Sequence, residues 1–141
     1  MISPQNTHVG YWLRTVSNHV SDAFTRRLEV EDVTIAEWNA LSEIWAAKEI
    51  MPSKLALTVG MTRGGMSKLI DRLIEKGLVD RAEGLTDRRY QTLTLSPIGK
   101  ALVPRLAQQA DDNEDEFFGH LSQRQRAELI ELLQNVIEEP V

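Results

Sequence analysis

The chain has 141 residues, 42% of them hydrophobic and 26% charged, which suits one compact domain or two small lobes that share helices. It carries a net charge of −5 and no cysteine, which excludes disulfides, thiolate metal sites and cysteine-based redox sensing. No stretch approaches the roughly 20 apolar residues that span a bilayer, and residues 1–10 lack the features of a signal peptide, so we expect a cytoplasmic protein with no membrane partner.

The first half of the chain has the spacing of two amphipathic helices. Over residues 7–28, apolar side chains recur three or four positions apart, which predicts the first helix. The second helix begins at a capping box, in which the Thr34 hydroxyl accepts a backbone N–H and Glu37 bonds back to the cap. Its predicted buried stripe consists of Ile35, Trp38, Leu41 and Trp45.

A helix, a turn and a longer helix follow. Ser53 is the predicted cap of a short helix over 54–59, Gly60-Met61 form the turn, and Thr62 is the predicted N-cap of a helix over 63–76. Its apolar residues share one face: Met66, Leu69, Ile70, Leu73 and Ile74. The same spacing leaves the other face to Arg63, Gly64, Ser67, Lys68, Asp71 and Arg72.

Beyond Gly77, a residue suited to the left-handed end of a helix, the pattern changes to strands. Residues 79–82 and 90–96 predict a two-stranded hairpin, and two more helices follow over 97–118 and from Ser122 to about 137. The predicted fold class is therefore mainly α with a small β-hairpin.

Positive charge is concentrated in the middle of the chain. Residues 53–100 hold nine Lys or Arg and five Asp or Glu, a balance of +4, whereas the remainder holds seven basic and 16 acidic residues, a balance of −9. A basic patch on one compact element is the electrostatic footprint of nucleic-acid binding. The acidic character of the whole chain is therefore compatible with double-stranded DNA as a partner.

The outer face of the helix over 63–76 has the properties of a recognition helix. The major groove of B-DNA admits one α-helix, and Arg63 and Lys68 can bond guanine O6 and N7 there. Thr62 and Ser67 can reach bases or phosphates. Each basic residue alone is more simply explained as solubilising charge, but together, on a helix followed by a hairpin, they favour DNA binding.

The predicted hairpin supplies a second contact. Arg88 and Arg89 at its tip can lie along the DNA backbone or enter a narrow minor groove, where the potential is more negative. Asp87 is expected to orient one of these arginines through a bidentate pair and not to touch DNA itself.

Several of these segments resemble the MarR family of bacterial transcription regulators, and the resemblance covers nearly the whole chain. They are Leu55-Ala56, Val59 to Thr62, Leu69 to Val79, Asp87-Arg88-Arg89 and Leu93 to Lys100. The resemblance implies a winged helix-turn-helix homodimer, in which residues 1–33 and 97–141 form intertwined dimerisation helices and 34–96 the DNA-binding module. It also implies a small aromatic or phenolic effector that releases DNA.

Two departures from the family pattern affect the DNA-binding prediction. The family's wing often repeats an Asp-x-Arg unit, whereas this chain keeps only Asp87-Arg88-Arg89. The recognition helix has Gly64-Gly65 where larger or hydroxyl side chains are frequent. The pair allows a close approach of the backbone to DNA or simply specifies the helix start weakly, and both explanations stay open.

The aromatic residues suggest where an effector could bind. His8, Tyr11, Trp12, Arg14, Trp38 and Trp45 could frame an apolar pocket in which Arg14 pairs with an aromatic carboxylate. The simpler alternative is that the tryptophans belong to the core and Arg14 is exposed. His8, His19 and His120 lack the spacing of metal ligands, so no metal and no other cofactor are expected.

Three classes of function compete for this sequence. The first is a homodimeric, ligand-responsive repressor that binds pseudo-palindromic operators, and dimerisation is favoured because the terminal helices carry apolar stripes that a small module cannot cover. The second is a winged-helix module for protein interaction or DNA architecture without specific readout. An enzyme is not expected, because Asp22, Glu29, Glu31 and Asp32 have no nearby histidine or nucleophile in a catalytic pattern.

Overall fold

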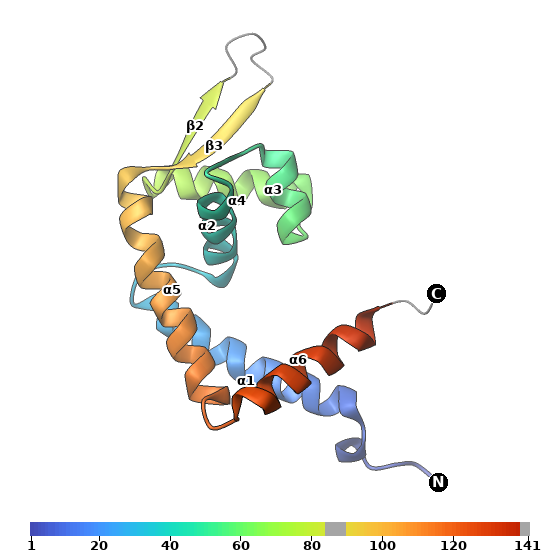
Figure 1. The fold of residues 1–141 in the computed structure, drawn as a ribbon. Helices are drawn as coiled ribbons and strands as arrows, with labels where there is room; N and C mark the ends of the chain where they lie inside the picture. The colour runs from blue at the N-terminus through green and yellow to red at the C-terminus, as the bar shows by residue number, and fades with distance from the viewer. Residues whose placement is uncertain (84–89, 139–141) are drawn as a thin grey trace. The chain divides into compact units, whose positions relative to one another are not determined.

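The computed structural model describes residues 1–83 and 90–138 and is mainly helical, with one small antiparallel sheet (Figure 1). Its elements are η1 (Gln5–Thr7), α1 (Val9–Glu29), α2 (Ile35–Ala47), β1 (Glu49–Ile50), α3 (Pro52–Val59), α4 (Arg63–Glu75), β2 (Val79–Glu83), β3 (Gln91–Leu95), α5 (Pro97–Phe118) and α6 (Gln123–Ile137). The predicted fold class is confirmed. The predicted hairpin tip, with Asp87, Arg88 and Arg89, lies outside the described residues.

The chain divides into two compact units. One consists of residues 24–109, and the other of residues 1–23 together with 110–141. The boundaries fall inside α1 and α5, so each of these long helices contributes to both units. The assignment of 1–33 and 97–141 to dimerisation and of 34–96 to DNA binding stays a prediction.

The sheet of unit 24–109 has three strands in the order β1-β3-β2, one more than the sequence predicts. The two hairpin strands pair Val79 with Leu95 and Arg81 with Leu93, and β1 adds Ile50 on the other side of Leu93. A two-residue strand is too short to show a period of two, so the sequence pattern could not reveal β1. Buried apolar residues of α2, α3, α4, the sheet and the first half of α5 form the core.

The capping box of α2 is confirmed, since Glu37 N donates to Thr34 Oγ1 at 3.1 Å and Thr34 N donates to Glu37 Oε1 at 2.9 Å. The buried face of α2 is Glu37, Ala40, Leu41 and Ile44. The predicted stripe was therefore wrong at Trp45, which is 48% exposed, because the buried face is centred on Glu37, Ala40 and Ile44, about a quarter turn of the helix from the predicted stripe. Ser53 was also wrong as a cap: α3 begins at Pro52, with Met51 as its N-cap.

The start of α5 is joined closely to the corner between α4 and β2. The Ser96 hydroxyl donates to Gly77 O at 2.6 Å and accepts from Gly99 N at 3.0 Å, which confirms Ser96 as the cap. A Cβ at Gly99 would overlap the Leu78 carbonyl, so only glycine permits this approach. Ser96 therefore links the end of β3 and the start of α5 to the residue that follows α4.

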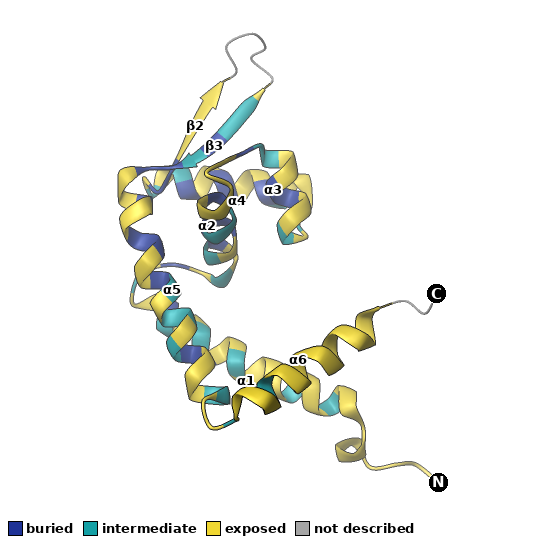
Figure 2. Ribbon diagram, in the orientation of Figure 1, coloured by how far each residue is buried: buried dark blue, intermediate teal, exposed yellow. Residues whose placement is uncertain are grey.

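The unit of residues 1–23 and 110–141 has little buried surface of its own. Asn113 Nδ2 donates to Val20 O at 3.2 Å, and Ser122 and Gln125 form the predicted capping box of α6. No residue of α6 is buried, and nearly the whole helix has the exposed colour (Figure 2). Within the described part of the chain, no helix has the combined length and apolarity needed to cross a membrane.

Candidate nucleic-acid interface

The predicted N-cap and the predicted inward face of α4 are both present in the structure. Gly65 N donates to Thr62 Oγ1 at 3.1 Å, which confirms Thr62 as the N-cap. Of the predicted inward face, Ile74 is half-buried and the other four residues are buried: Met66, Leu69, Ile70 and Leu73. Gly77, with φ 74°, ends the helix in the left-handed region, as expected.

The opposite face of α4 is open to solvent. Thr62, Arg63, Gly64, Ser67, Lys68, Asp71 and Arg72 are exposed, and Gly65 is half-buried. The first turn contains no acidic residue, so its free N–H groups and positive dipole end meet no anion of their own turn. The beginning of this face is therefore suited to a polyanion.

A hollow of about 730 Å³ lies beside this face, between α3, α4 and the hairpin strands. It is lined by Met51, Pro52, Ser53, Arg63, Met66, Ser67, Ile70, Arg81 and Gln91. The hollow places Arg63 and Ser67 of α4 and Arg81 of β2 around one concave surface, so the hairpin strands contribute positive charge next to the helix.

Arg81 is a residue of this surface that the sequence analysis missed. Its Nη2 lies 3.1 Å from Asp71 Oδ1 on α4, so the pair ties the base of the hairpin to the outer face of the helix. Exposed pairs of this kind contribute at most about 1 kcal/mol to the stability of a fold. The main effect of this pair is therefore to orient the Arg81 side chain toward α4. The signal in the sequence was an arginine at an exposed strand position ten residues after an exposed aspartate.

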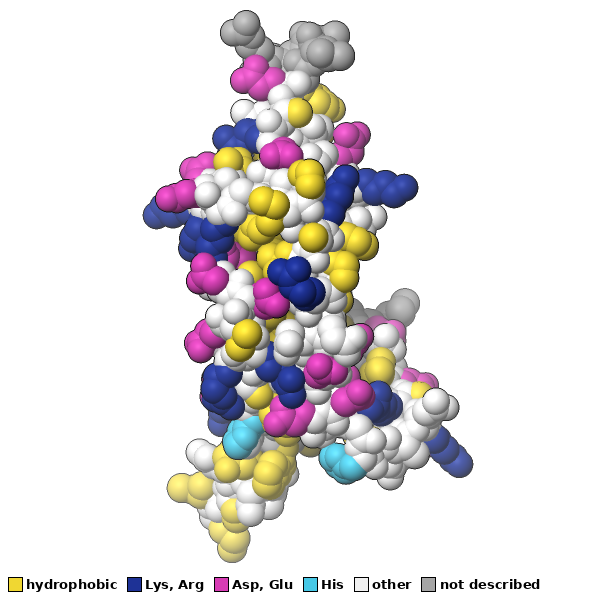
Figure 3. Space-filling view, turned by 90° about the vertical axis from the view of Figure 1, so that its left-hand side faces the viewer, with side chains coloured by type: hydrophobic (Ala, Val, Ile, Leu, Met, Phe, Trp, Pro, Cys, Tyr) yellow, Lys and Arg dark blue, Asp and Glu magenta, His cyan; other side chains and the backbone are white. Residues whose placement is uncertain are grey.

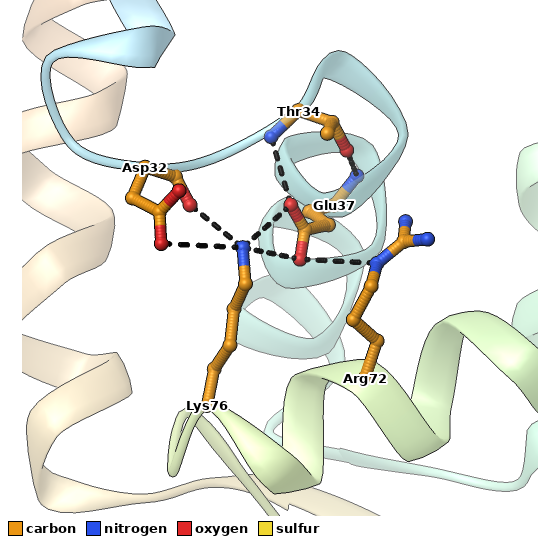
Figure 4. A network of polar contacts seen from close by, with 5 residues as sticks. All are labelled: Asp32, Thr34, Glu37, Arg72 and Lys76. Carbon is orange, nitrogen blue, oxygen red and sulfur yellow. Dashed lines mark hydrogen bonds and ion pairs between the residues drawn. The ribbon is translucent and has the colours of Figure 1, made fainter.

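A buried carboxylate connects α2 with the end of α4 (Figure 4). Lys76 Nζ lies 3.0 Å from Glu37 Oε1 and 2.9 Å from Oε2, and it also donates to Asp32 O at 2.7 Å. Arg72 Nε is 3.5 Å from Glu37 Oε2, although half of the Arg72 side chain remains exposed. Arg72, which we predict to contact DNA, is therefore paired with a buried carboxylate while half of its side chain faces solvent.

The environment of Glu37 favours its charged form. Burial by itself would raise the pKa of the Glu37 carboxyl, but the hydrogen bond from Lys76, the hydrogen bonds at Thr34 and the charge of Lys76 outweigh it, so the pKa lies below its ordinary value. An ionised Glu37 can therefore hold both Arg72 of α4 and Lys76, the C-cap residue of that helix, at neutral pH.

Charges of both signs are interspersed on one face of the molecule. On the face shown in Figure 3, Lys and Arg side chains lie among Asp and Glu side chains, and hydrophobic side chains lie between them. The positive charge on this face therefore does not form one continuous basic field.

The six residues predicted for an effector pocket fall in both units. His8, Tyr11, Trp12 and Arg14 belong to the unit of residues 1–23 and 110–141, where the Tyr11 and Trp12 rings meet edge to face at 5.2 Å. Trp38 packs against the core of unit 24–109, and Trp45 is on the same helix but exposed. The six-residue pocket stays a prediction.

The helix pair α3–α4 followed by the antiparallel strands β2 and β3 defines a winged helix-turn-helix protein of the DNA-binding class. The sequence profile of the MarR family matches residues 31–89, and a putative transcriptional regulatory protein for the hcr operon of Thauera aromatica is 30% identical over 129 residues, covering 91% of this chain and 78% of that protein. The chain belongs to the MarR family of transcriptional regulators.

Further relatives agree with this assignment. The multiple antibiotic resistance protein MarR of Salmonella typhimurium is 27% identical over 107 residues, covering 75% of this chain and 74% of that one. The crystal structure of a mutant MarR from E. coli complexed with operator DNA superposes with a TM-score of 0.83 at 26% identity, covering 92% of this chain and 94% of that chain.

Replacing Glu37 by Gln should lower the free energy of unfolding at neutral pH by about 2 kcal/mol, because a charged hydrogen bond to Lys76 is lost. The folded pKa lies below the unfolded one, so the ionised carboxyl stabilises the fold above its ordinary pKa, and this contribution disappears as pH falls through the lowered pKa. Urea unfolding between pH 3 and 7 measures both effects.

The matched control for this variant is Glu75→Gln, at an exposed position of α4. It should change the stability by less than about 0.5 kcal/mol. A constant difference between the Glu37 variant and the wild type at every pH would show that ionisation of Glu37 does not stabilise the fold.

Replacing Gly64 by Ala should raise the free energy of unfolding by about 0.5 kcal/mol, because a Cβ there meets open space in the first turn of a helix. At Gly65, by contrast, a Cβ would lie 3.1 Å from the Thr62 hydroxyl and disturb the cap, so Gly65→Ala should gain less. Urea unfolding measures both changes in stability.

The affinity of Gly64→Ala for DNA distinguishes the two explanations of the glycine pair. Weaker DNA binding would show that glycine allows a close approach of the backbone to DNA. Unchanged affinity would support the explanation that the pair only specifies the helix start weakly.

Proposed function

We propose that this chain is a homodimeric, ligand-responsive repressor that binds pseudo-palindromic operator DNA. The recognition helix is α4, whose outer residues Thr62, Arg63, Ser67 and Lys68 face the major groove, with Gly64-Gly65 at the closest approach. Arg72 supports the same face, and the predicted tip residues Arg88 and Arg89, oriented by Asp87, make the second contact.

One observation carries this proposal: α4 is fixed by four buried apolar residues while its cationic and hydroxyl side chains remain exposed. A helix serves as a reader of base edges only if it is held rigidly and keeps its polar face free. Both conditions hold for α4. The likeness to E. coli MarR, whose structure was determined with operator DNA, supports the same use of the fold here.

Dimerisation is supported by the apolar surface of the unit of residues 1–23 and 110–141. Val136 and Ile137 of α6 are 73% and 81% exposed, and Trp12 of α1 is 52% exposed. A hollow of about 490 Å³ between α1 and α6 is lined largely by apolar side chains, among them Leu13, Phe118, Leu129 and Leu133. Apolar surface of this extent marks an interaction site, and a second copy of the chain would cover it.

A two-fold dimer explains the operator symmetry that we propose. Two copies of α4 about one DNA turn apart, roughly 34 Å, would contact half-sites that repeat in opposite orientation. Release of the operator by a small aromatic compound completes the proposed function. The alternative, a winged-helix module without specific readout, is favoured by Gly64 and Gly65, which offer no side chain to base edges, and by the reduced wing, which keeps only Asp87-Arg88-Arg89.

Replacing Lys68 by Ala should weaken binding to the DNA upstream of the chain's own gene and reduce the slope of log affinity against log salt by about 1, because one phosphate or base contact is lost. Fluorescence anisotropy at several salt concentrations measures this slope. Arg26→Ala, at an exposed position in the last turn of α1, is the control and should leave it unchanged. Equal affinity of the wild type for this DNA and for random duplex would favour the alternative function.

Replacing Leu133 by Glu should convert the dimer to a 16.0 kDa monomer, because a charge would be buried in the proposed interface. Sedimentation equilibrium measures the mass. Asn135→Glu places the same charge on the polar side of α6, beside Glu128 and Glu131, and should leave the dimer intact. A wild-type chain that sediments as a monomer at micromolar concentration would contradict the proposal.

A further inference from the structure

The two oxygens of the buried Glu37 carboxylate have different surroundings. Oε1 accepts hydrogen bonds from Thr34 N at 2.9 Å and from Lys76 Nζ at 3.0 Å. Oε2 lies 2.9 Å from Lys76 Nζ and 3.5 Å from Arg72 Nε, but no hydrogen bond reaches it from any of the described residues. A buried oxygen is costly to leave without a donor, so Oε2 is an acceptor for a nearby N–H group that is still free.

Arg72 has free donors at this carboxylate, whereas Lys76 does not. The ammonium group of Lys76 has three N–H groups, and it lies within 3.0 Å of both Glu37 oxygens and of Asp32 O. Arg72 has five N–H groups, and only its Nε faces Glu37. The terminal nitrogens of Arg72 point away from the carboxylate (Figure 4), and they have no partner among the described residues. Arg72 can therefore bind a second anion while it stays paired with Glu37.

Arg72 lies at the margin of the outer face of α4. It follows Lys68 by four residues, so the two exposed side chains are neighbours on the helix surface. When a helix lies in the major groove, its outermost side chains meet base edges, and side chains at its margins meet the phosphates beside the groove. The two terminal nitrogens of an arginine can donate to one phosphate together. Arg72 therefore has both the position and the free donors for a phosphate of the DNA backbone.

We propose that Glu37 is a positioning residue for DNA binding: its Oε2 holds Arg72 by Nε, so that the terminal nitrogens of Arg72 contact one backbone phosphate. The inference rests on the proposed use of α4 as the recognition helix. A guanidinium is planar, so an acceptor at Nε fixes the direction of both terminal nitrogens. Lys76 balances the charge of Glu37 from the other side, so the carboxylate directs Arg72 without cancelling its positive charge.

The positioning role and simple electrostatics predict opposite effects of the same substitution. Glu37→Gln removes a negative charge from unit 24–109, and by charge alone this change should tighten binding to a polyanion. If Glu37 positions Arg72, the substitution should instead weaken binding, because the guanidinium loses the acceptor that directs it. If Glu37 only joins α2 to α4, the effect of the substitution on affinity should be the same whether or not Arg72 is present.

The test is a double-mutant cycle of Glu37→Gln and Arg72→Gln in the full chain, with a random-sequence DNA duplex as the probe and fluorescence anisotropy as the measurement. Arg72→Gln should weaken binding about tenfold and reduce the slope of log affinity against log salt by about 1, because a phosphate contact is lost. Glu37→Gln should weaken binding about fivefold when Arg72 is present and less than about 1.5-fold when it is replaced, because residues that act through one contact are not additive. Circular dichroism checks that each variant is folded.

A second variant tests the proposal even if Glu37→Gln does not fold. Arg72→Lys keeps the positive charge but has no guanidinium plane, so it should still weaken binding about fivefold. The matched control is Arg105→Gln on α5, where the guanidinium pairs with Glu31 through Nε at 3.2 Å and Nη2 at 3.3 Å and the side chain is 58% exposed. It should change the affinity less than about 1.5-fold, because this arginine lies outside α4 and the hairpin strands.

Three results would overturn the positioning role: wild-type affinity in Arg72→Gln or Arg72→Lys, tighter binding by Glu37→Gln, or equal effects of Glu37→Gln with and without Arg72. The wild type is also titrated with the DNA upstream of its own gene. A non-additive cycle without preference for that DNA supports the positioning role and refutes the specific repressor. An additive cycle with a clear preference refutes the positioning role and leaves the repressor standing.

Discussion

One buried carboxylate joins two helices of unit 24–109. Glu37 caps its own helix through Thr34 and at the same time holds Lys76, so the beginning of α2 and the end of α4 are fixed to each other by charge. A buried charge is stable only when it is paired and hydrogen-bonded, and here both partners, Arg72 and Lys76, lie on or directly after α4. The orientation of the exposed face of α4 is therefore set from inside the protein, at the end opposite to its cap.

Much of this structure was predictable, because helix caps and helix faces depend on residues that are close together in the sequence. Thr34, Thr62 and Ser122 are N-caps whose hydroxyls accept the expected backbone N–H groups, and Gly77 takes the positive φ that its position requires. The inward and outward faces of α4 follow directly from a period of 3.6 residues. These features depend on neighbours within one helical turn, which the sequence displays.

Features that depend on distant residues were not predictable. Glu37 was predicted only as a cap, because nothing local shows that Lys76, 39 positions later, neutralises it in the core. Glu37 shares the buried face of α2 with Ala40, Leu41 and Ile44, and Trp45 lies outside that face. The pairing of Arg81 with Asp71 and the third strand likewise arise from tertiary contacts that a periodic pattern does not contain.

The three-stranded sheet has edges that discourage further pairing. Its centre, β3, is bonded on both sides; β1 offers only two residues at one edge, and β2 at the other carries Asp80, Arg81 and Glu83. Short or charged edges give an incoming strand no template. A strand from a second copy would therefore find little to pair with at either described edge of this sheet.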